Sequence, residues 1–208
     1  MLDLYVSTFA TLFVVIDPVG CAPIFAGLTA GHPPRYAAAT AIRASVIASC
    51  ILFVFALFGK ALLGALHIEL NAFRVAGGIM LFLIALDMVF EKRTQRREER
   101  VEQVKATPVH EDVSVFPMAM PMIAGPGSIA TVMLMMGHAT DHASALTVLA
   151  ALASVLLITA AALLAANPLM RLLGSRVEAV VTRVLGVLLG ALAVQYVIDG
   201  LRGVVLGG

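Results

Sequence analysis

The stretch Asp17-Pro18-Val19-Gly20-Cys21-Ala22-Pro23 interrupts an apolar run that extends from about Leu4 to Leu28. Proline lacks the N–H that an α-helix requires and glycine lowers helix propensity, so this stretch disfavours a continuous helix. It also contains an acid near the middle of the run, where a charge costs about 2.5 to 3.5 kcal/mol on membrane-insertion scales. The pattern predicts an interrupted membrane helix beside an internal polar site.

The composition of the whole chain indicates an integral membrane protein. Of its 208 residues, 61% are apolar and 13% are charged, and the mean hydropathy is +0.99. A soluble domain is typically about half apolar and about one quarter charged. We expect one all-α transmembrane domain over residues 1–208, with no cleaved signal peptide. Six apolar runs are long enough to cross a hydrocarbon core of about 30 Å: 4–28, 38–63, 71–90, 114–137, 144–166 and 181–201.

A second interruption, from Pro117 to Gly127, lies inside the fourth apolar run and has its centre at Gly125-Pro126-Gly127. A shift of about 109 residues brings it near the first interruption and places Phe73-Arg74-Val75-Ala76-Gly77 on Thr182-Arg183-Val184-Leu185-Gly186. Matches of this length between apolar spans also arise by chance, and proline and glycine can simply kink packed helices. The paired interruptions favour a true repeat.

The repeat predicts the topology of the chain. Each copy, about 1–90 and about 113–208, contains three spans, so the second copy enters the membrane from the opposite side. We therefore expect six transmembrane helices arranged as two inverted three-helix repeats, with broken first and fourth helices. Secondary transporters commonly have inverted repeats with interrupted helices and bind substrate at the midplane between them.

The basic residues predict the orientation. A charged loop over about 91–112 separates the repeats, and with both termini outside the cell eleven of the fourteen Lys and Arg residues fall on the cytoplasmic side. Cytoplasmic loops are enriched in Lys and Arg, so this orientation is favoured. The eleven are Arg35, Arg43, Lys92, Arg93, Arg96, Arg97, Arg100, Lys105, Arg171, Arg176 and Arg183.

The two interruptions together predict one substrate site. The first offers a carboxylate suited to cap a helix, together with carbonyls that its prolines leave without donors. The second begins a helix whose free amides near Gly127 and Ser128 attract anions. Because the residues around both are small, the cavity should be small. The predicted substrate-binding residues are Asp17, Pro18, Gly20, Cys21, Pro23, Gly125, Pro126, Gly127, Ser128 and Thr131.

Other polar residues at membrane depth are weaker candidates. Thr8, Thr11 and Gln195 could line the cavity, although Ser and Thr in membrane helices often bond to their own backbone. The residues near span ends are expected to lie at the interface, and the Gly186-x-x-x-Gly190 motif indicates a close helix contact inside the fold or between protomers. The residues near span ends are Arg74, Asp87, Arg183 and Asp199.

Three ordered stretches resemble the signatures of the MarC family, also called the small neutral amino-acid transporter family. They are Asp17-Pro18-Val19-Gly20-x-x-Pro23-Ile24-Phe25, the segment from Phe73 to Met88, and Pro121-x-x-Ala124-Gly125-Pro126-Gly127-Ser128-Ile129. The resemblance covers essentially the whole chain. It implies a six-span bacterial or archaeal inner-membrane protein that carries glycine, alanine or similar amino acids, coupled to protons or another ion such as sodium. Cys21 stands where this family often has Asn.

The leading hypothesis is a secondary transporter of a small neutral amino acid, with Asp17 as the candidate coupling residue because burial raises the pKa of a carboxylate. A non-transporting assembly or regulatory protein is the alternative, and a thiol-disulfide carrier using Cys21 and Cys50 is a weaker one. An enzyme is not expected, because the five histidines show no metal-ligand spacing and Ser128 has no evident base. We expect membrane lipid as a partner and possible homo-oligomers, with no cofactor, metal or nucleic acid.

Overall fold

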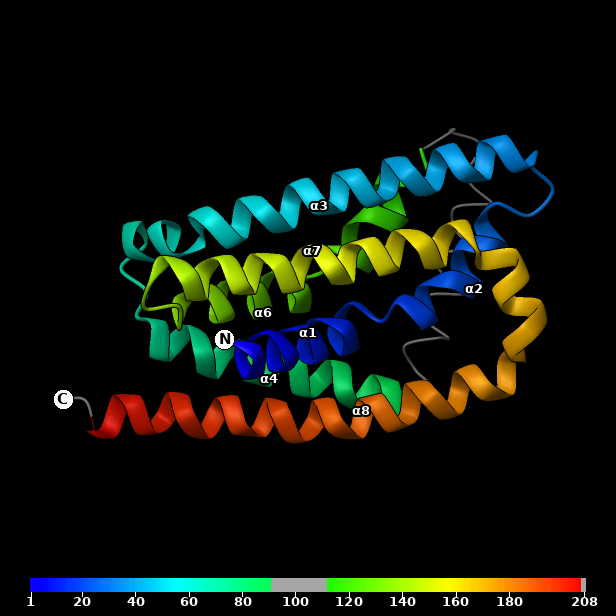
Figure 1. The fold of residues 1–208 in the computed structure, drawn as a ribbon. Helices are drawn as coiled ribbons and strands as arrows, with labels where there is room; N and C mark the ends of the chain where they lie inside the picture. The colour runs from blue at the N-terminus through cyan, green and yellow to red at the C-terminus, as the bar shows by residue number, and fades with distance from the viewer. Residues whose placement is uncertain (91–111, 207–208) are drawn as a thin grey trace.

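The computed structural model describes residues 1–90 and 112–206, and these residues form helices and short connections without strands (Figure 1). The loop predicted to be cytoplasmic lies, from 91 to 111, outside the described residues. The helices in chain order are α1 (Leu2–Ile16), α2 (Pro18–Leu28), α3 (Pro34–Ala65), α4 (Leu70–Val89), η1 (Ser114–Ile123), α6 (Pro126–Gly137), α7 (His142–Leu164) and α8 (Ala166–Leu206).

All six apolar runs predicted from the sequence coincide with helical segments. Five spans are long and apolar enough to cross a membrane, and a sixth results if η1 and α6, which are bent by 51° at a short break, count as one. The protein is therefore a multi-pass integral membrane protein. The five spans are Leu2–Leu28, Pro34–Ala65, Leu70–Val89, His142–Leu164 and Ala179–Val205.

The ends of the helices place both termini at the same end of the bundle. In Figure 1 the start of α1 and the end of α8 lie toward one end, whereas the connections from α2 to α3 and from α7 to α8 lie at the other. An even number of membrane crossings has this result, which agrees with the prediction that the two termini share one side.

The first span is more buried than the other four long spans. In the most apolar window of the first span, 61% of the residues are buried, compared with 28% for the windows in α3, α4 and α8. The outer helices expose large apolar side chains such as Leu57, Leu157 and Val187. Lipid tails are as apolar as these side chains, so their exposure carries no hydrophobic cost in a membrane.

Each interrupted segment packs against helices of the other half of the chain. α1 and α2 contact α7, and α2 also contacts α8. In the second half, η1 and α6 contact α3, and α6 also contacts α4. The last helices of the two halves, α4 and α8, pack against each other. The core that holds the two interruptions is thus built from both halves together.

Glycines allow α4 and α8 to approach closely. A Cβ atom added to Gly78 would lie 2.8 Å from the carbonyl oxygen of Ala193, and one added to Gly186 would lie 2.8 Å from the Cβ of Met88. Gly190 faces Ala85 in the same way, at 3.7 Å from its Cβ. Of the two arrangements that the sequence allowed for the Gly186-x-x-x-Gly190 motif, the structure has the contact inside the fold.

The boundary between α7 and α8 lies just before Asn167-Pro168. α7 begins with a capping box, in which the Asp141 carboxylate accepts from the Ser144 amide at 2.9 Å, and it ends at Leu164. α8 begins at Ala166, so Asn167 lies inside the first turn and is not its cap. Pro168 is tolerated there because the first turn of a helix needs no donor from it.

Candidate functional site

Asp17 forms the first interruption by itself. Its backbone is left-handed, with φ 58° and ψ 67°, and it separates the end of α1 from the start of α2. A following proline disfavours the helical conformation, and Asp is one of the few residues that tolerate the left-handed one. The Asp17 amide closes α1 on the carbonyl of Phe13 at 2.9 Å, while its own carbonyl accepts from the Cys21 amide at 3.0 Å.

The Asp17 carboxylate caps α2, as predicted. Its Oδ1 atom accepts from the Gly20 amide at 3.0 Å, and the residue is only 1% exposed. The cap needs glycine at this position, because a Cβ atom on Gly20 would lie 2.2 Å from Asp17 Oδ2. The buried charge therefore has a fixed place beside a helix start, which favours anions through its dipole.

The other residues predicted for the first interruption lie in or against the core. Pro18, Gly20 and Cys21 are buried and Pro23 is half-buried. The Cys21 thiol donates to the carbonyl of Ile16 at 3.5 Å, and Cys50 is a free cysteine on an exposed position of α3. Neither proline has an N–H to give to the carbonyl four residues earlier, so the carbonyls of Val14 in α1 and Val19 in α2 lack the donor that a continuous helix would supply.

The second interruption is longer and irregular. Inside η1 the backbone is extended at Phe116 and Met120, each of which precedes a proline through a cis peptide bond. A residue before proline is restricted to this region, which explains both positions. The interruption predicted from Pro117 to Gly127 is present but begins one residue earlier, at Phe116, and ends where α6 begins at Pro126.

The start of α6 has no side-chain cap. Gly125 is its N-cap residue, and the helical hydrogen bonds begin with the Ile129 amide on the Gly125 carbonyl at 3.0 Å. The amides of Gly127 and Ser128 precede this bond, so they have no partner within the helix itself. Ser128 and Thr131 are both buried, and the Thr131 hydroxyl donates to the Gly127 carbonyl at 2.8 Å.

The ten predicted residues fall into two groups, one at each interruption. The groups approach each other through Val15 of α1, whose Cγ1 lies 3.5 Å from the position of a Cβ atom on Gly127. Ile84 and Leu81 of α4 close on the same glycine, with atoms at 2.5 Å and 3.6 Å from that position. Apolar side chains of α1 and α4, both in the first half of the chain, therefore surround the uncapped start of α6.

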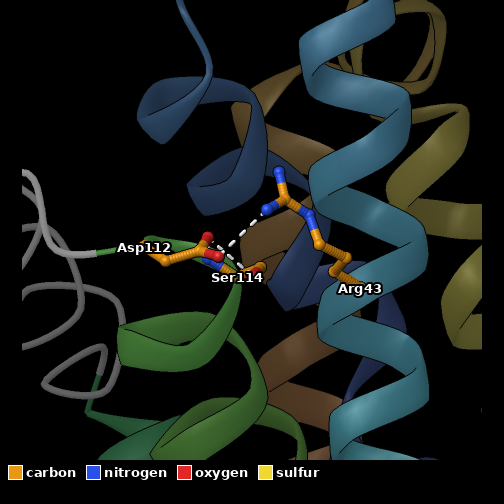
Figure 2. Close-up of polar contacts among 3 residues, drawn as sticks. All are labelled: Arg43, Asp112 and Ser114. Atoms are coloured by element: carbon orange, nitrogen blue, oxygen red, sulfur yellow. Dashed lines mark hydrogen bonds and ion pairs between the residues drawn. The ribbon is translucent and has the colours of Figure 1, made fainter.

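An ion pair that the sequence reasoning missed holds the start of the second interruption (Figure 2). Arg43 of α3 donates to Oδ2 of Asp112 at 3.1 Å. The other carboxylate oxygen accepts from the amide and the hydroxyl of Ser114, at 3.0 and 2.7 Å. These contacts, with the Ser114 hydroxyl first, hold the pKa of Asp112 below its usual value. An Asp two residues before a buried Ser at the start of an apolar run was the available signal.

A second polar contact that the sequence did not predict lies at the other end of α6. The Arg74 guanidinium of α4 contacts Nε2 of His138, which follows α6. His138 Nδ1 lies 2.8 Å from the Leu134 carbonyl, and a carbonyl can only accept, so Nδ1 carries the proton and Nε2 accepts from Arg74. Desolvation, followed by the Arg74 charge, lowers the pKa of His138. Arg74 thus joins two helices besides lying near a span end.

The weaker candidates are mostly occupied by other partners. The Thr8 hydroxyl points to the sulfur of Met135 at 3.7 Å, and Thr11 is buried. Gln195 is exposed and donates to Asp199 at 2.8 Å. Among the residues that the structure describes, no group of three metal-ligating side chains comes together.

Comparison with known proteins decides the family. A family model described as "MarC family integral membrane protein" matches residues 2–205. The chain belongs to the MarC family. The resemblance predicted from the three sequence signatures is therefore confirmed.

Relatives of similar length occur in archaea and bacteria. The UPF0056 membrane protein MJ1677 of Methanocaldococcus jannaschii is 35% identical over 99% of both chains. YvbG of Bacillus subtilis is 35% identical, with 98% of this chain and 96% of the relative covered, and YhcE of Escherichia coli is 29% identical, with 98% and 94% covered. Both are likewise UPF0056 membrane proteins. No solved structure matches this MarC chain significantly.

Proposed function

We propose that this MarC family member is a secondary transporter of small neutral amino acids such as glycine and alanine. The observation that carries the proposal is the pairing of a buried acid with an uncapped helix start in the core. Asp17 is 1% exposed, and Val15, two residues before it, packs against Gly127 at the start of α6. Polar groups at membrane depth are costly, so their retention favours a functional role.

The substrate would lie between the two interruptions. The free amides of Gly127 and Ser128 suit its carboxylate, and Asp17, with the carbonyls that Pro18 and Pro23 leave without donors, suits its ammonium group. Cys21, Gly20, Gly125, Pro126 and Thr131 complete the proposed site. The apolar side chains that close on Gly127 support a small substrate, because they leave little room for a long side chain.

An inverted repeat would supply the conformational change. The contacts between the halves are reciprocal: the first interrupted segment packs on α7 and α8, and the second packs on α3 and α4. This exchange supports two related three-helix units whose broken helices are α1–α2 and η1–α6. Rocking of one unit against the other would then open the midplane site to either side in turn.

Coupling to a proton or to sodium would drive the transport. Asp17 is the candidate, since a buried carboxylate can be neutralised by a proton or by the substrate ammonium, and these two roles compete. We place the protein in the bacterial inner membrane with both termini in the periplasm. The shared end of the two termini and the bias of Lys and Arg support this orientation.

One observation favours a non-transporting assembly or regulatory role instead. The Asp17 carboxylate is already used as the cap of α2, and apolar side chains pack on Gly127, so both interruptions could be packing features. The geometry gives a thiol-disulfide carrier no support, since Cys21 is buried in α2 and Cys50 lies on an exposed position of α3.

Uptake into liposomes tests the proposal. Purified protein should take up labelled glycine or alanine saturably, and a proton or sodium gradient should raise the rate. Asp17→Asn keeps an oxygen for the cap but loses the charge, so we expect it to remove the gradient dependence. Asp3→Asn, at an exposed acid of α1, is the matched control. Well-folded protein that takes up no small amino acid would contradict the proposal, and full gradient dependence in Asp17→Asn would exclude the coupling role.

A further inference from the structure

A cluster of charged and polar side chains lies at the end of α6 that is remote from the proposed midplane site. Its members come from three helices: Arg74 from α4, His138 after α6, and Gln195 and Asp199 from α8. His138 follows Gly127 by eleven residues, which is about 16 Å of helix. In Figure 1 this end of α6 lies toward the end of the bundle that holds both termini.

Among the described residues, Arg74 is a cation without an acidic partner. Its one described hydrogen bond goes to the neutral Nε2 of His138, and its Nε atom is buried without a partner among the described residues. No carboxylate in the described part of the chain lies within 4 Å of the Arg74 guanidinium. A partly buried guanidinium normally finds a carboxylate or phosphate, often through two parallel hydrogen bonds.

Asp199 is the matching acid without a cation. Its Oδ1 atom accepts from the uncharged Gln195 amide at 2.8 Å, and no described Lys, Arg or His nitrogen lies within ion-pair distance. The charges of Arg74 and Asp199 act on the same His138 imidazole, with opposite effects on its pKa. A positive and a negative group, neither of them in an ion pair among the described residues, therefore act on a common neighbour.

The geometry points to Arg74 and Asp199 as a docking subsite for a small zwitterion, at the end of the bundle where the termini lie. The guanidinium would bind the α-carboxylate and Asp199 would bind the α-ammonium group. His138 holds Arg74 in place through Nε2 and is a positioning residue. This subsite rests on the proposed transport function, because it would receive the substrate before α6 guides it to the midplane.

The helices explain why the two charges stand together. Asn71 of α4 faces Gly203 of α8, and a Cβ atom on Gly200 would lie 2.7 Å from Val75 Cγ2. These contacts on either side of Arg74 bring its turn of α4 against the turn of α8 that carries Asp199. Leu70 packs on Gly137 and so fixes the end of α6 beside them.

The test measures initial uptake of labelled glycine into liposomes and, separately, equilibrium binding of labelled glycine to the protein in detergent. Loss of a charge-assisted hydrogen bond should raise KM by about tenfold or more in Arg74→Gln and Asp199→Asn, and should weaken glycine binding at the subsite, but not at the midplane site, by the same factor. The maximal rate should change by less than about twofold, because the midplane site is intact. Arg74→Lys keeps the charge but loses the paired N–H donors of the guanidinium, so its KM should lie between those of the parent protein and Arg74→Gln. N-acetylglycine and glycinamide, which each lack one charge, should compete poorly.

Lys60→Gln is the matched control. It removes an exposed positive charge near the C-terminal end of α3 and should leave KM and binding unchanged. Melting curves and size-exclusion profiles show whether each variant is folded. If Arg74→Gln does not fold, Asp199→Asn still tests the subsite.

If the parent protein transports glycine and both variants keep its KM, the subsite is wrong and the transport proposal stands. If the protein binds glycine through Arg74 and Asp199 but carries none, the transport proposal is wrong and the subsite stands. If it neither binds nor carries any small zwitterion, both are wrong.

Discussion

The two interruptions differ in how the following helix begins. In the first, a single left-handed Asp17 turns the chain, and its carboxylate caps the next helix through the Gly20 amide. In the second, the irregular backbone extends from Phe116 to Gly125, and the following helix α6 begins with no side-chain cap. The first is compact and internally satisfied, whereas the second leaves helix-start amides for another partner.

The difference shows where a charge is needed. Backbone groups at membrane depth must find partners within the protein or a cavity, because lipid offers none. Asp17 supplies that partner to α2 from within its own chain segment. The start of α6 has no such acid, so an anionic group of a bound molecule would suit it better than it would suit α2.

An acid precedes α2 and another precedes η1, and the two acids differ in their exposure to water. Asp17 is 1% exposed, whereas the side chain of Asp112, which holds the start of η1, is 42% exposed and paired with an Arg43 side chain that is 52% exposed. Water screens the second acid but not the first, so the same type of contact should contribute very different free energies.

The largest expected effect is that of Gly20→Ala. The added Cβ would lie 2.2 Å from Asp17 Oδ2, so the carboxylate must leave the Gly20 amide. Loss of the cap and of a hydrogen bond to a buried charge should lower the free energy of unfolding by about 3 kcal/mol. Unfolding by a denaturing detergent in mixed micelles measures the change.

The matched control for this prediction is Gly27→Ala in the same helix. Nothing lies within 4 Å of a Cβ atom at Gly27, so the variant should be as stable as the parent protein or more stable by up to about 1 kcal/mol. Equal stability of Gly20→Ala and Gly27→Ala would show that the Asp17 cap contributes nothing.

Two substitutions at the second interruption should have intermediate effects on stability, and they can be compared with each other. In Gly125→Ala the new Cβ would lie 2.4 Å from the Pro121 carbonyl oxygen, which is backbone and cannot move away cheaply. We expect a loss of about 2 kcal/mol. In Gly127→Ala the obstacle is the Cδ1 atom of Ile84 at 2.5 Å, the end of a flexible side chain, and we expect a loss under about 1 kcal/mol.

The same micelle unfolding assay measures both variants, and glycine uptake separates their functional effects. Gly127→Ala should reduce uptake more than its small loss of stability explains, because the methyl group enters the proposed carboxylate site. Normal uptake by a stable Gly127→Ala protein would argue against substrate contact at this glycine.

The smallest effect is expected at the exposed acid. The folded-state pKa of Asp112 lies below its usual 3.8, so its stabilisation is fully present above that value and is lost as the pH falls through the folded pKa. The difference in melting temperature between the parent protein and Asp112→Asn should therefore be constant from neutral pH to about pH 5 and disappear in stronger acid. The contribution of Asp112 to the free energy of unfolding should stay under about 1 kcal/mol, since Asp112 and Arg43 are both well solvated.

Two further variants rank the causes of this shift. The Ser114 hydroxyl is the largest cause and the Arg43 charge the smallest. Ser114→Ala should therefore move the acid transition to higher pH by more than Arg43→Gln does. High salt should weaken the Arg43 contribution and leave the Ser114 contribution nearly unchanged. The reverse ranking would show that the ion pair, not the hydrogen bonds, holds the carboxylate.

Much of the fold could be predicted from the sequence because membrane spans are long and uniform. The six apolar runs and both interruptions follow from hydropathy and from the local effects of proline and glycine, which require no knowledge of distant contacts. The Asp17 cap also followed from its place before Pro18. The length of the last helix was harder to predict, because α8 (Ala166–Leu206) begins well before the apolar run predicted at 181–201.

The pairs that connect distant parts of the chain could not be predicted in this way. Arg43 and Asp112 are 69 residues apart, and Arg74 and His138 are 64 apart. The sequence assigned Arg43 to the cytoplasmic side and Arg74 to a span end but gave neither a partner, because a sequence pattern describes neighbours along one helix and not across the bundle. The contact of Val15 with Gly127 depends in the same way on how α1 packs against α6.

The sequence by itself determined that this is a multi-pass helical membrane protein of the MarC family, with two interruptions and a buried acid between α1 and α2. The reason is local, since hydropathy and proline chemistry act within one segment. Only the tertiary structure decided that the Gly186 motif joins α4 within the chain, that apolar side chains of α1 and α4 close on Gly127, and that Arg74 and Asp199 face one imidazole. These features depend on packing between helices, where close approach and burial are properties of pairs of segments.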